Sequence, residues 1–346
     1  MSEQYLSLCK HYDTQNINMM NIEMISKKTQ QKTEETNKKQ KRWGKKFEDK
    51  RNWKEYNEGL VRRGELYLSL DFLESWDNEL DKMNKGKKGA PFAYPEQFVN
   101  YMAFVYSIFH IPYRQMEGYL RKLSDLVSRD IAADYTTLFK RIAKMNMTLP
   151  ETLSEKGEDV IIAMDSSGVK VTNRGEWMRE KWKVYRGWIK AHIAVDIKNK
   201  ETLAIEITDE TVSDSEKFDD LINQTEHNIE GKKIERVLGD GGYDDKDCFN
   251  TLDKKKIESG IKTRINASTR SRGSPYRAKC VREKQKLGGY KGWRDKYEYG
   301  KRWIAEAIFS AVKRIFGETV RATSIDGMFR EAKMKFMCYN ILLKWV

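Results

Sequence analysis

The sequence contains little cysteine. Only four occur in 346 residues, and no two of them form a CxxC pair. They are Cys9, Cys248, Cys280 and Cys338. This spacing argues against a disulfide framework or a zinc site and fits a reducing cytoplasm. Long apolar runs are also missing: none approaches the roughly 20 residues that a transmembrane helix needs, and the amino terminus lacks the apolar stretch of a signal peptide. We therefore expect a cytoplasmic protein.

Acidic residues are outnumbered by basic ones. The chain has 52 Asp and Glu against 65 Lys and Arg, which gives a net charge of +13. Such a surplus favours a polyanionic partner, because each cation that neutralises a phosphate releases condensed counterions. An anionic membrane is the competing partner, but the basic residues are spread over several segments and no strongly apolar helix accompanies them. The composition favours nucleic acid over a membrane.

Hydrophobic residues make up only 39% of the chain, so we expect that part of it has no core of its own. The first 58 residues fit this description, because they are rich in Lys, Gln, Asn, Glu and Thr and contain few large apolar side chains. We predict a basic, flexible N-terminal arm over residues 1–58 that contacts DNA weakly and without sequence preference. A tail that is merely solvated is the alternative.

Residues 59–155 change to a helical pattern, with apolar residues recurring at three- and four-residue spacing. We predict an all-α domain that binds DNA or supports dimerisation. Its stretches 113–127 and 134–145, joined by the short segment SRDIAA, are compatible with a helix-turn-helix. The basic residues predicted to contact DNA from the second stretch are Lys140, Arg141 and Lys144. A plain helical bundle shows the same periodicity and stays the alternative.

Residues 156–346 begin with strand patterns and end with a strong helix. Three apolar or alternating stretches come first, and helical and strand stretches then alternate along the chain. The opening strands are expected at 158–165, 187–197 and 202–208. This order predicts an α/β fold with a ribonuclease-H-like mixed sheet flanked by helices, preceded by the all-α DNA-binding domain.

Two carboxylates follow apolar strands of this domain. Asp165 is expected at the end of the first strand and Asp240 at the end of the fourth. If these strands are neighbours, the two side chains meet at one end of the sheet and would repel each other unless a cation lay between them. Hard oxygen ligands suit Mg²⁺ or Mn²⁺. The alternative is that each Asp merely starts a turn. The nearby Asp244 and Asp245 could lend charge to the site, but helix capping explains them more simply.

A polar stripe on the last predicted helix supplies a third acid. Its members fall at offsets of 0, 3, 7 and 14 residues and share one face roughly 60° wide. They are Tyr299, Arg302, Glu306 and Lys313. Apolar residues occupy the opposite face and are expected to pack on the sheet. An ordinary surface ion pair between Arg302 and Glu306 is the alternative, but it explains neither Tyr299 nor Lys313.

These motifs together resemble the DDE transposases of prokaryotic insertion sequences, and more specifically the group of insertion sequence types 5 and 4. The stripe matches the Y-R-E-K signature of that group, and MDSSGVKV resembles its D-S-T-G opening, with Ser167 where Thr is usual. The blocks GEWMREKW, WIKAHIAVD, LAIEITDETVSD and LGDGGYDD follow in the usual order. The resemblance covers residues 60–346.

The resemblance implies that Asp165, Asp240 and Glu306 are the catalytic carboxylates and hold two Mg²⁺ (or Mn²⁺) ions roughly 3.5–4 Å apart. One ion would activate water and later a DNA 3′-hydroxyl, and the other would stabilise the leaving oxygen. Arg302 and Lys313 would hold phosphates near the element's end, with Tyr299 against the DNA. The family also implies a homodimer on inverted-repeat ends and target DNA, an association with the nucleoid, and no small-molecule substrate.

Further DNA contacts are expected in a basic insertion at about 262–302, where aromatic side chains are interleaved with cations. The candidates there are Arg270, Arg272, Arg277 and Trp293. A solvated loop is the alternative. Lys190 and His192 lie two residues apart in a Trp-x-Lys-x-His block that the family shares, and we include them as DNA contacts. A buried histidine satisfied by its neighbours is the alternative there.

Two rival functions remain open at this stage. A nuclease or resolvase of the same fold would cut DNA without joining it. A non-catalytic regulator would only bind DNA through the helical region, but binding alone needs no cluster of acids facing phosphate. The sequence therefore favours a transposase that cleaves at the ends of an insertion sequence and transfers the strands into target DNA.

Overall fold

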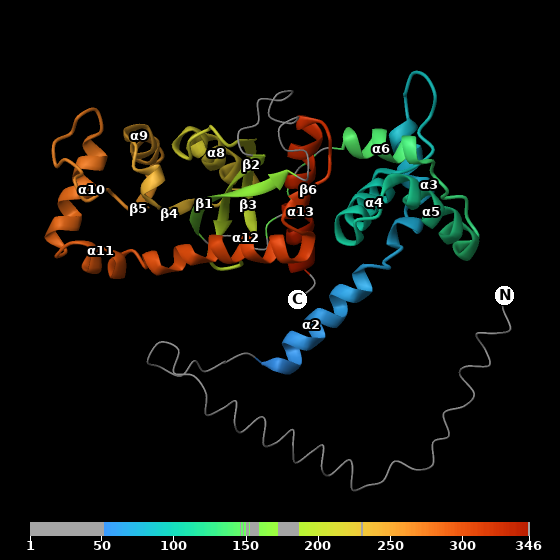
Figure 1. Cartoon of the computed structure of the whole chain (residues 1–346), viewed down its shortest axis with the longest axis horizontal. Coiled ribbons are helices and arrows are strands. Elements are labelled where there is room, and N and C mark those ends of the chain that lie inside the picture. The colour runs from blue at the N-terminus through green and yellow to red at the C-terminus, as the bar shows by residue number, and fades with distance from the viewer. Residues whose placement is uncertain are drawn as a thin grey trace, which may run out of the picture. The chain divides into compact units, whose positions relative to one another are not determined.

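The computed structural model describes residues 52–344, except 146, 148, 150, 151, 153–158, 172–186 and 230. Residues Glu55–Val346 form one compact unit that contains a mixed sheet, helices packed against it and an all-helical region (Figure 1). Almost all of the predicted N-terminal arm lies outside the described residues, as does the block GEWMREKW.

The sheet has six strands in the order β3-β2-β1-β4-β5, with β6 paired to β1 beyond this path. They are β1 (Val160–Val171), β2 (Trp188–Asp196), β3 (Thr202–Asp209), β4 (Ile234–Gly239), β5 (Glu258–Ile261) and β6 (Thr319–Val320). Strand β2 is antiparallel to β1 and β3, whereas the β1–β4, β4–β5 and β1–β6 pairs are parallel. The mixed sheet is confirmed, and so is the expectation that the first and fourth strands are neighbours.

The first strand is longer than the sequence predicts. Asp165 does not end β1, which continues to Val171 because β2 pairs with it as far as Lys170 and β6 pairs with its last two residues. The parallel neighbour β4 pairs with β1 only as far as Ala163. Asp165 therefore lies in the middle of its strand but level with the carboxyl end of β4, next to Asp240.

Side chains of the sheet point alternately into two cores. From β1, Ala163 belongs to one core, whereas Ile162 and Met164 belong to the other. Helices α12 and α13 cover the first core, and α8 and α9 cover the second (Figure 1). Their bounds are α8 (Phe218–Asn228), α9 (Lys246–Lys255), α12 (Trp303–Phe316) and α13 (Ile325–Leu343). The apolar face of α12 packs as the stripe predicted.

Five α-helices and the short 3₁₀ helix Asp71–Leu73 precede the sheet in the described part of the chain. The α-helices are α2 (Trp53–Leu66), α3 (Trp76–Asn84), α4 (Glu96–Phe109), α5 (Tyr113–Val127) and α6 (Tyr135–Ala143). Pro95 and Pro112 are the N-caps of α4 and α5, a position where the missing N–H costs no hydrogen bond. Helix α2 begins inside the predicted arm. Apolar residues of α4, including Phe98 and Met102, share one core with α12 and α13.

A buried lysine on α13 fixes the connection between α12 and that helix. The Lys335 ammonium is almost fully enclosed and donates to the carbonyl oxygens of Gly317, at 3.0 Å, and Thr319, at 2.6 Å. Burial lowers the pKa of Lys335 to about 8 from an ordinary value of 10.5. Between these two pH values the folded chain binds fewer protons than the unfolded chain, so this residue makes the free energy of unfolding rise with pH.

We expect the difference in unfolding free energy between wild type and Lys335→Met to change by on the order of 2 to 3 kcal/mol between about pH 7.5 and about pH 10, in favour of wild type at the higher pH. Urea denaturation followed by circular dichroism at both pH values measures it. Taking the difference between the two proteins cancels the titration of groups that they share. A difference that stays constant with pH would show that Lys335 titrates normally in the folded chain.

Candidate active site

Asp165 is the centre of the acidic site. Its side chain is 16% exposed, its Oδ1 accepts a hydrogen bond from the Ser166 backbone N–H at 3.0 Å, and its Oδ2 lies 3.0 Å from Arg302 Nη1. Burial raises the pKa of Asp165 above its ordinary value; the Arg302 charge opposes this, and the negative charges of Asp240 and Glu306 add to it. The three acids predicted from the sequence therefore interact electrostatically.

Asp240 reaches the site from the turn after β4. It is the N-cap of the short 3₁₀ helix Gly241–Tyr243, and its Oδ1 accepts a hydrogen bond from the Gly242 N–H at 2.8 Å. The side chain thus does start a turn, as the alternative interpretation holds. The same residue also acts on the pKa of Asp165, so the turn and the acidic cluster coexist at the end of β4.

Arg302 and Glu306 come from the last part of the chain. The polar stripe does not lie on one continuous α-helix: Tyr299–Arg302 is a 3₁₀ turn, and α12 begins at Trp303. Arg302 Nη2 donates to Glu306 Oε1, so the guanidinium bridges Asp165 and Glu306. Arg302 is 18% exposed and Glu306 is 59% exposed, which leaves the Glu306 carboxylate free to turn.

Lys313 lies about two turns beyond Glu306 on α12, beside a cavity of 460 Å³. Its Nζ donates to Ser167 Oγ at 2.8 Å, and burial lowers the pKa of this lysine. The cavity is lined by Asp165, Ser166, Ser167, Glu306, Phe309, Ser310, Lys313, Arg314 and Glu318. Ser310 is exposed at this surface, and its small side chain leaves room in the cavity. Carboxylates and an ammonium group thus share one open hollow.

The chemistry of these donors fits a hard cation. The carboxylate oxygens of Asp165, Asp240 and Glu306 are the ligands that Mg²⁺ and Mn²⁺ prefer, and a positive group, Arg302, already lies between two of them. Within the described residues, no three His, Cys, Asp or Glu side chains are arranged so that they could hold a metal ion. Ligation by all three acids therefore requires Arg302 to move away from Asp165 and Glu306.

Several predicted DNA contacts are engaged inside the protein. His192 is fully buried, with Nε2 3.0 Å from Thr208 Oγ1, and Lys190 Nζ lies 2.7 Å from a carboxylate oxygen of Asp214. Arg141 pairs with Glu96 at 3.0 Å and bonds the Tyr94 carbonyl oxygen. Lys190 and Arg141 are paired with acids, and His192 is buried with a hydrogen-bond partner for Nε2 but none for Nδ1 among the described residues.

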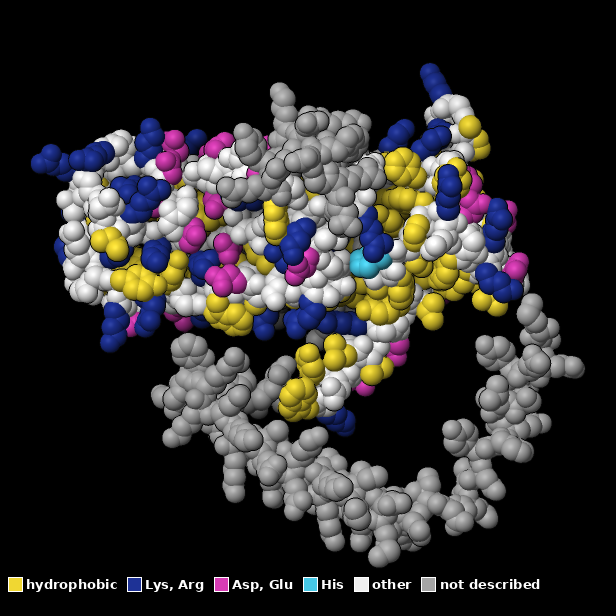
Figure 2. All heavy atoms as spheres, viewed as in Figure 1, with side chains coloured by type: hydrophobic (Ala, Val, Ile, Leu, Met, Phe, Trp, Pro, Cys, Tyr) yellow, Lys and Arg dark blue, Asp and Glu magenta, His cyan; other side chains and the backbone are white. Residues whose placement is uncertain are grey.

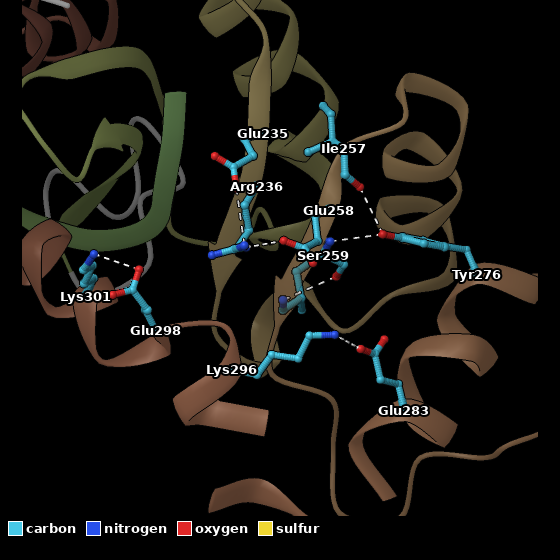
Figure 3. Close-up of polar contacts among 11 residues, drawn as sticks. Glu235, Arg236, Ile257, Glu258, Ser259, Tyr276, Glu283, Lys296, Glu298 and Lys301 are labelled. Atoms are coloured by element: carbon cyan, nitrogen blue, oxygen red, sulfur yellow. Dashed lines mark hydrogen bonds and ion pairs between the residues drawn. The ribbon is translucent and has the colours of Figure 1, made fainter. Parts of the chain in front are cut away.

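The basic insertion is folded rather than a loop. It contains α10 (Pro275–Lys286) and α11 (Tyr290–Lys296), and Arg277 in α10 makes a bidentate ion pair with the buried Asp244, at 2.7 and 2.9 Å. Asp244 thus anchors α10, whereas Asp245 caps α9 as expected. Figure 3 shows how Tyr276 fixes α10 to β5: its hydroxyl donates to the Ile257 carbonyl oxygen and accepts from the Ser259 N–H, both at 3.1 Å.

The predicted aromatic contacts of the insertion are also buried. Trp293 is 2% exposed, and its ring centroid lies 4.9 Å from that of Tyr299, which is 8% exposed. Together with Tyr297 they form a small aromatic core between α11 and the 3₁₀ turn. In this conformation neither ring offers a face on which a base could stack, so the prediction of direct stacking on Trp293 is not supported by its position.

Four predicted DNA contacts are exposed and make no ion pair with any other described residue: Lys140, Lys144, Arg270 and Arg272. The first two lie on or beside α6, and the other two lie in the segment before α10. Figure 2 shows further Lys and Arg side chains spread over the end of the unit that α9, α10 and α11 form. Among the described residues, no acid pairs with Lys140, Lys144, Arg270 or Arg272 and so competes with a phosphate for them.

Sequence reasoning missed one acid beside the site, Asp214. It follows β3 and takes part in an ion pair with Lys190, whose side chain was assigned to DNA. The signal was present in the block LAIEITDETVSD, which ends on this residue. Nothing in the sequence alone tells which of the acids in that block turns inward.

Two family models match the chain, and both are described as a transposase DDE domain. One matches residues 156–341 and the other residues 61–174. The first match alone spans more than half of the chain, so the chain belongs to the DDE transposases. It is an enzyme of DNA transposition, and the regulator and the plain nuclease are not favoured.

Membership of this family brings two general properties. DDE transposases act on DNA, and their catalytic domains generally use divalent metal ions. Both agree with the acidic site at the end of β4 and with the net charge of +13. In the described part of the chain, no helix combines the length and the apolar character that crossing a bilayer demands.

Proposed function

We propose that this chain is the transposase of an insertion sequence of the type 5 and type 4 group, and that Asp165, Asp240 and Glu306 are its catalytic carboxylates. It cleaves the DNA at the ends of the element and transfers the freed strands into target DNA. The observation that carries this proposal is that three acids from distant segments come near one another. Arg302 pairs with both Asp165 and Glu306, and burial together with the charges of Asp240 and Glu306 raises the pKa of Asp165.

The three carboxylates would hold two Mg²⁺ or Mn²⁺ ions, which supply Lewis acidity and a nucleophile active at neutral pH. The residues of the chain position the DNA around them. Arg302, once released from Asp165 and Glu306, presents a planar pair of N–H groups that suits a phosphate. Lys313, held by Ser167, directs an ammonium group at the same cavity. Tyr299, whose ring packs against Trp293 three residues before Arg302 in the 3₁₀ turn, would support that turn rather than stack on a base.

The remaining parts of the chain would bring the DNA to this site. We assign residues 59–155 to DNA binding and dimerisation, with Lys140 and Lys144 on the DNA side of α6, and residues 1–58 to a basic arm. Residues 156–346 form the catalytic domain in this scheme. The enzyme would act as a homodimer on paired inverted-repeat ends, in association with the nucleoid. The exposed cations of α6 and the insertion support this arrangement.

Removing two free cations of the insertion is expected to change the salt dependence of DNA binding. The double variant Arg270→Ala/Arg272→Ala should reduce the magnitude of the slope of log affinity against log salt by roughly 2. The reason is that the counterions of two phosphates are no longer released when the protein binds. Fluorescence anisotropy on labelled end DNA at several salt concentrations measures this. Lys200→Ala/Lys233→Ala is the matched control, because both lysines are exposed and lie outside the segments assigned to DNA. Equal slopes for the two double variants would exclude Arg270 and Arg272 from the interface.

The proposed function is tested with labelled element-end DNA and Mg²⁺ or Mn²⁺. New 3′-hydroxyl ends that depend on the metal, followed by their joining to target DNA, are the expected products. Cleavage without joining would instead identify a nuclease. Binding without cleavage by the wild-type chain would leave a regulator, and the assignment of the three carboxylates would be wrong.

A further inference from the structure

Asp214 lies beside the acidic site but is not one of its three carboxylates. Its Oδ1 is 2.7 Å from Lys190 Nζ and 3.3 Å from His192 Nδ1, and its side chain is 20% exposed. Lys190 also donates to the Val212 carbonyl oxygen at 3.1 Å, and His192 is fixed from its other side by Thr208. The Asp214 carboxylate is therefore held in one place by two residues of β2.

The same carboxylate contacts both segments that carry the catalytic aspartates. Burial acts to raise the pKa of Asp214, but the pKa is lowered overall, and the Ser166 side chain, directly after Asp165, is one of the groups that lower it. On the other side, a Cβ added to Gly242 would lie 3.0 Å from Asp214 Oδ2 and 3.0 Å from Asp240 Oδ1. Asp214 and Asp240 thus flank one glycine, and this close approach explains why the turn after Asp240 has no side chain at position 242.

A buried tyrosine marks the centre of this arrangement. Tyr243 is fully buried, and burial together with the charges of Asp214, Asp165 and Asp240 raises its pKa. The three carboxylates therefore all lie near enough to this phenol group to act on its pKa. Its hydroxyl oxygen is enclosed and has no hydrogen-bond partner among the described residues.

We propose that Asp214 is a positioning residue of the catalytic site: clamped by Lys190 and His192, it fixes the separation between Asp165 and Asp240 through Ser166 and the Gly242 turn. This proposal rests on the proposed function, because it assumes that the two aspartates bind metal ions. It also gives the Trp-x-Lys-x-His block a different task from DNA contact. Lys190 and His192 support the carboxylate that sets the metal site.

The test is Mn²⁺ binding to the full chain without DNA, followed by electron paramagnetic resonance. Asp214→Asn keeps the shape of the side chain and removes its charge, and we expect roughly tenfold weaker Mn²⁺ binding, the size of effect typical for groups that orient metal ligands. The Mn²⁺ concentration that gives half-maximal cleavage should rise by the same factor, with the KM for DNA unchanged. Asp220→Asn is the matched control, because Asp220 forms a similar ion pair with Lys217 away from the site.

Mn²⁺ affinity equal to wild type in Asp214→Asn would overturn the positioning role. If Asp214→Asn does not fold, Ser166→Ala decides: it removes the link to Asp165 but leaves the Lys190 and His192 contacts, and weaker Mn²⁺ binding supports the role whereas unchanged binding refutes it. Glu306→Gln serves as the reference. If it binds Mn²⁺ like wild type, the metal assignment fails and the positioning role with it; if only Asp214→Asn binds normally, the positioning role alone fails.

Discussion

Replacing Glu306 by Gln is expected to lower metal-dependent cleavage of element-end DNA by at least about 10³-fold, because a charged metal ligand is lost where transition-state charge must be stabilised. Gln keeps the size of the side chain and can still accept a hydrogen bond from Arg302. Glu306 is 59% exposed at the start of α12, so its replacement should leave the unfolding free energy nearly unchanged. The measurement is the rate of 3′-hydroxyl formation on labelled DNA at saturating Mg²⁺ or Mn²⁺.

Glu298→Gln is the matched control for this variant. Glu298 lies just before the 3₁₀ turn, is about as exposed as Glu306, and pairs with Lys301 at 2.8 Å (Figure 3). Its replacement removes one negative charge from the same part of the chain, so the cleavage rate should stay within about twofold of wild type. Similar losses in both variants would mean that the general charge of this segment matters, and that Glu306 is not a specific ligand.

Replacing Arg302 by Ala should affect metal binding and cleavage in opposite directions. The guanidinium pairs with Asp165 and Glu306 where a metal ion would have to bind, so its removal frees both carboxylates. We expect Mn²⁺ binding without DNA to tighten by roughly tenfold, in line with the strength of hydrogen bonds between charged groups. Cleavage should nevertheless fall by about 100-fold, because a group that holds the reacting phosphate is lost.

Mn²⁺ titration and single-turnover cleavage on the same preparations measure the two effects. Lys301→Ala is the control, since Lys301 precedes Arg302 but pairs with Glu298 on the surface. Arg302→Lys is expected to restore the weaker Mn²⁺ binding but not cleavage, because an ammonium group cannot form the planar bidentate contact. Mn²⁺ binding that weakens in Arg302→Ala would show that the guanidinium organises the carboxylates instead of competing with the metal.

The acids of the site were predictable because their positions follow from short-range patterns. Apolar strands ending near Asp165 and Asp240 and a helical stripe through Glu306 are visible in the sequence. The extension of β1 beyond Asp165 was not, since it depends on pairing with β2 and β6, which are distant in the chain. A sequence pattern reflects the residues that are close together in the chain, and it does not show which distant strand will pair with a given segment.

The elements that were missed have weak apolar patterns. Helix α13 is 19 residues long, yet Glu331, Lys335 and Asn340 are buried within it and interrupt its apolar face. Helix α10 is basic, and its place in the fold depends on the ion pair between Arg277 and Asp244 and on the Tyr276 hydroxyl. Such polar contacts join segments far apart in sequence, so spacing within one segment does not reveal them.

The same cause explains the residues assigned to DNA that turned out to be engaged elsewhere. The sequence around a lysine or arginine does not show whether it will pair with an acid of the protein or with a phosphate. Lys190, Arg141 and Arg277 each pair with an acid from another segment, whereas Arg270 and Arg272 have no such partner among the described residues. The charge composition predicts that the protein binds phosphates, but it does not show which cations remain unpaired within the protein and available to bind them.

The Tyr276 hydroxyl has a consequence for how two copies can meet. By bonding the Ile257 carbonyl oxygen and the Ser259 N–H, it occupies backbone groups along the outer side of β5, the last strand on that side of the sheet. An incoming strand from another molecule would have to compete with this ring for those groups. The described sheet is thereby protected from growing at β5, so copies of the chain that associate have to do so through other surfaces.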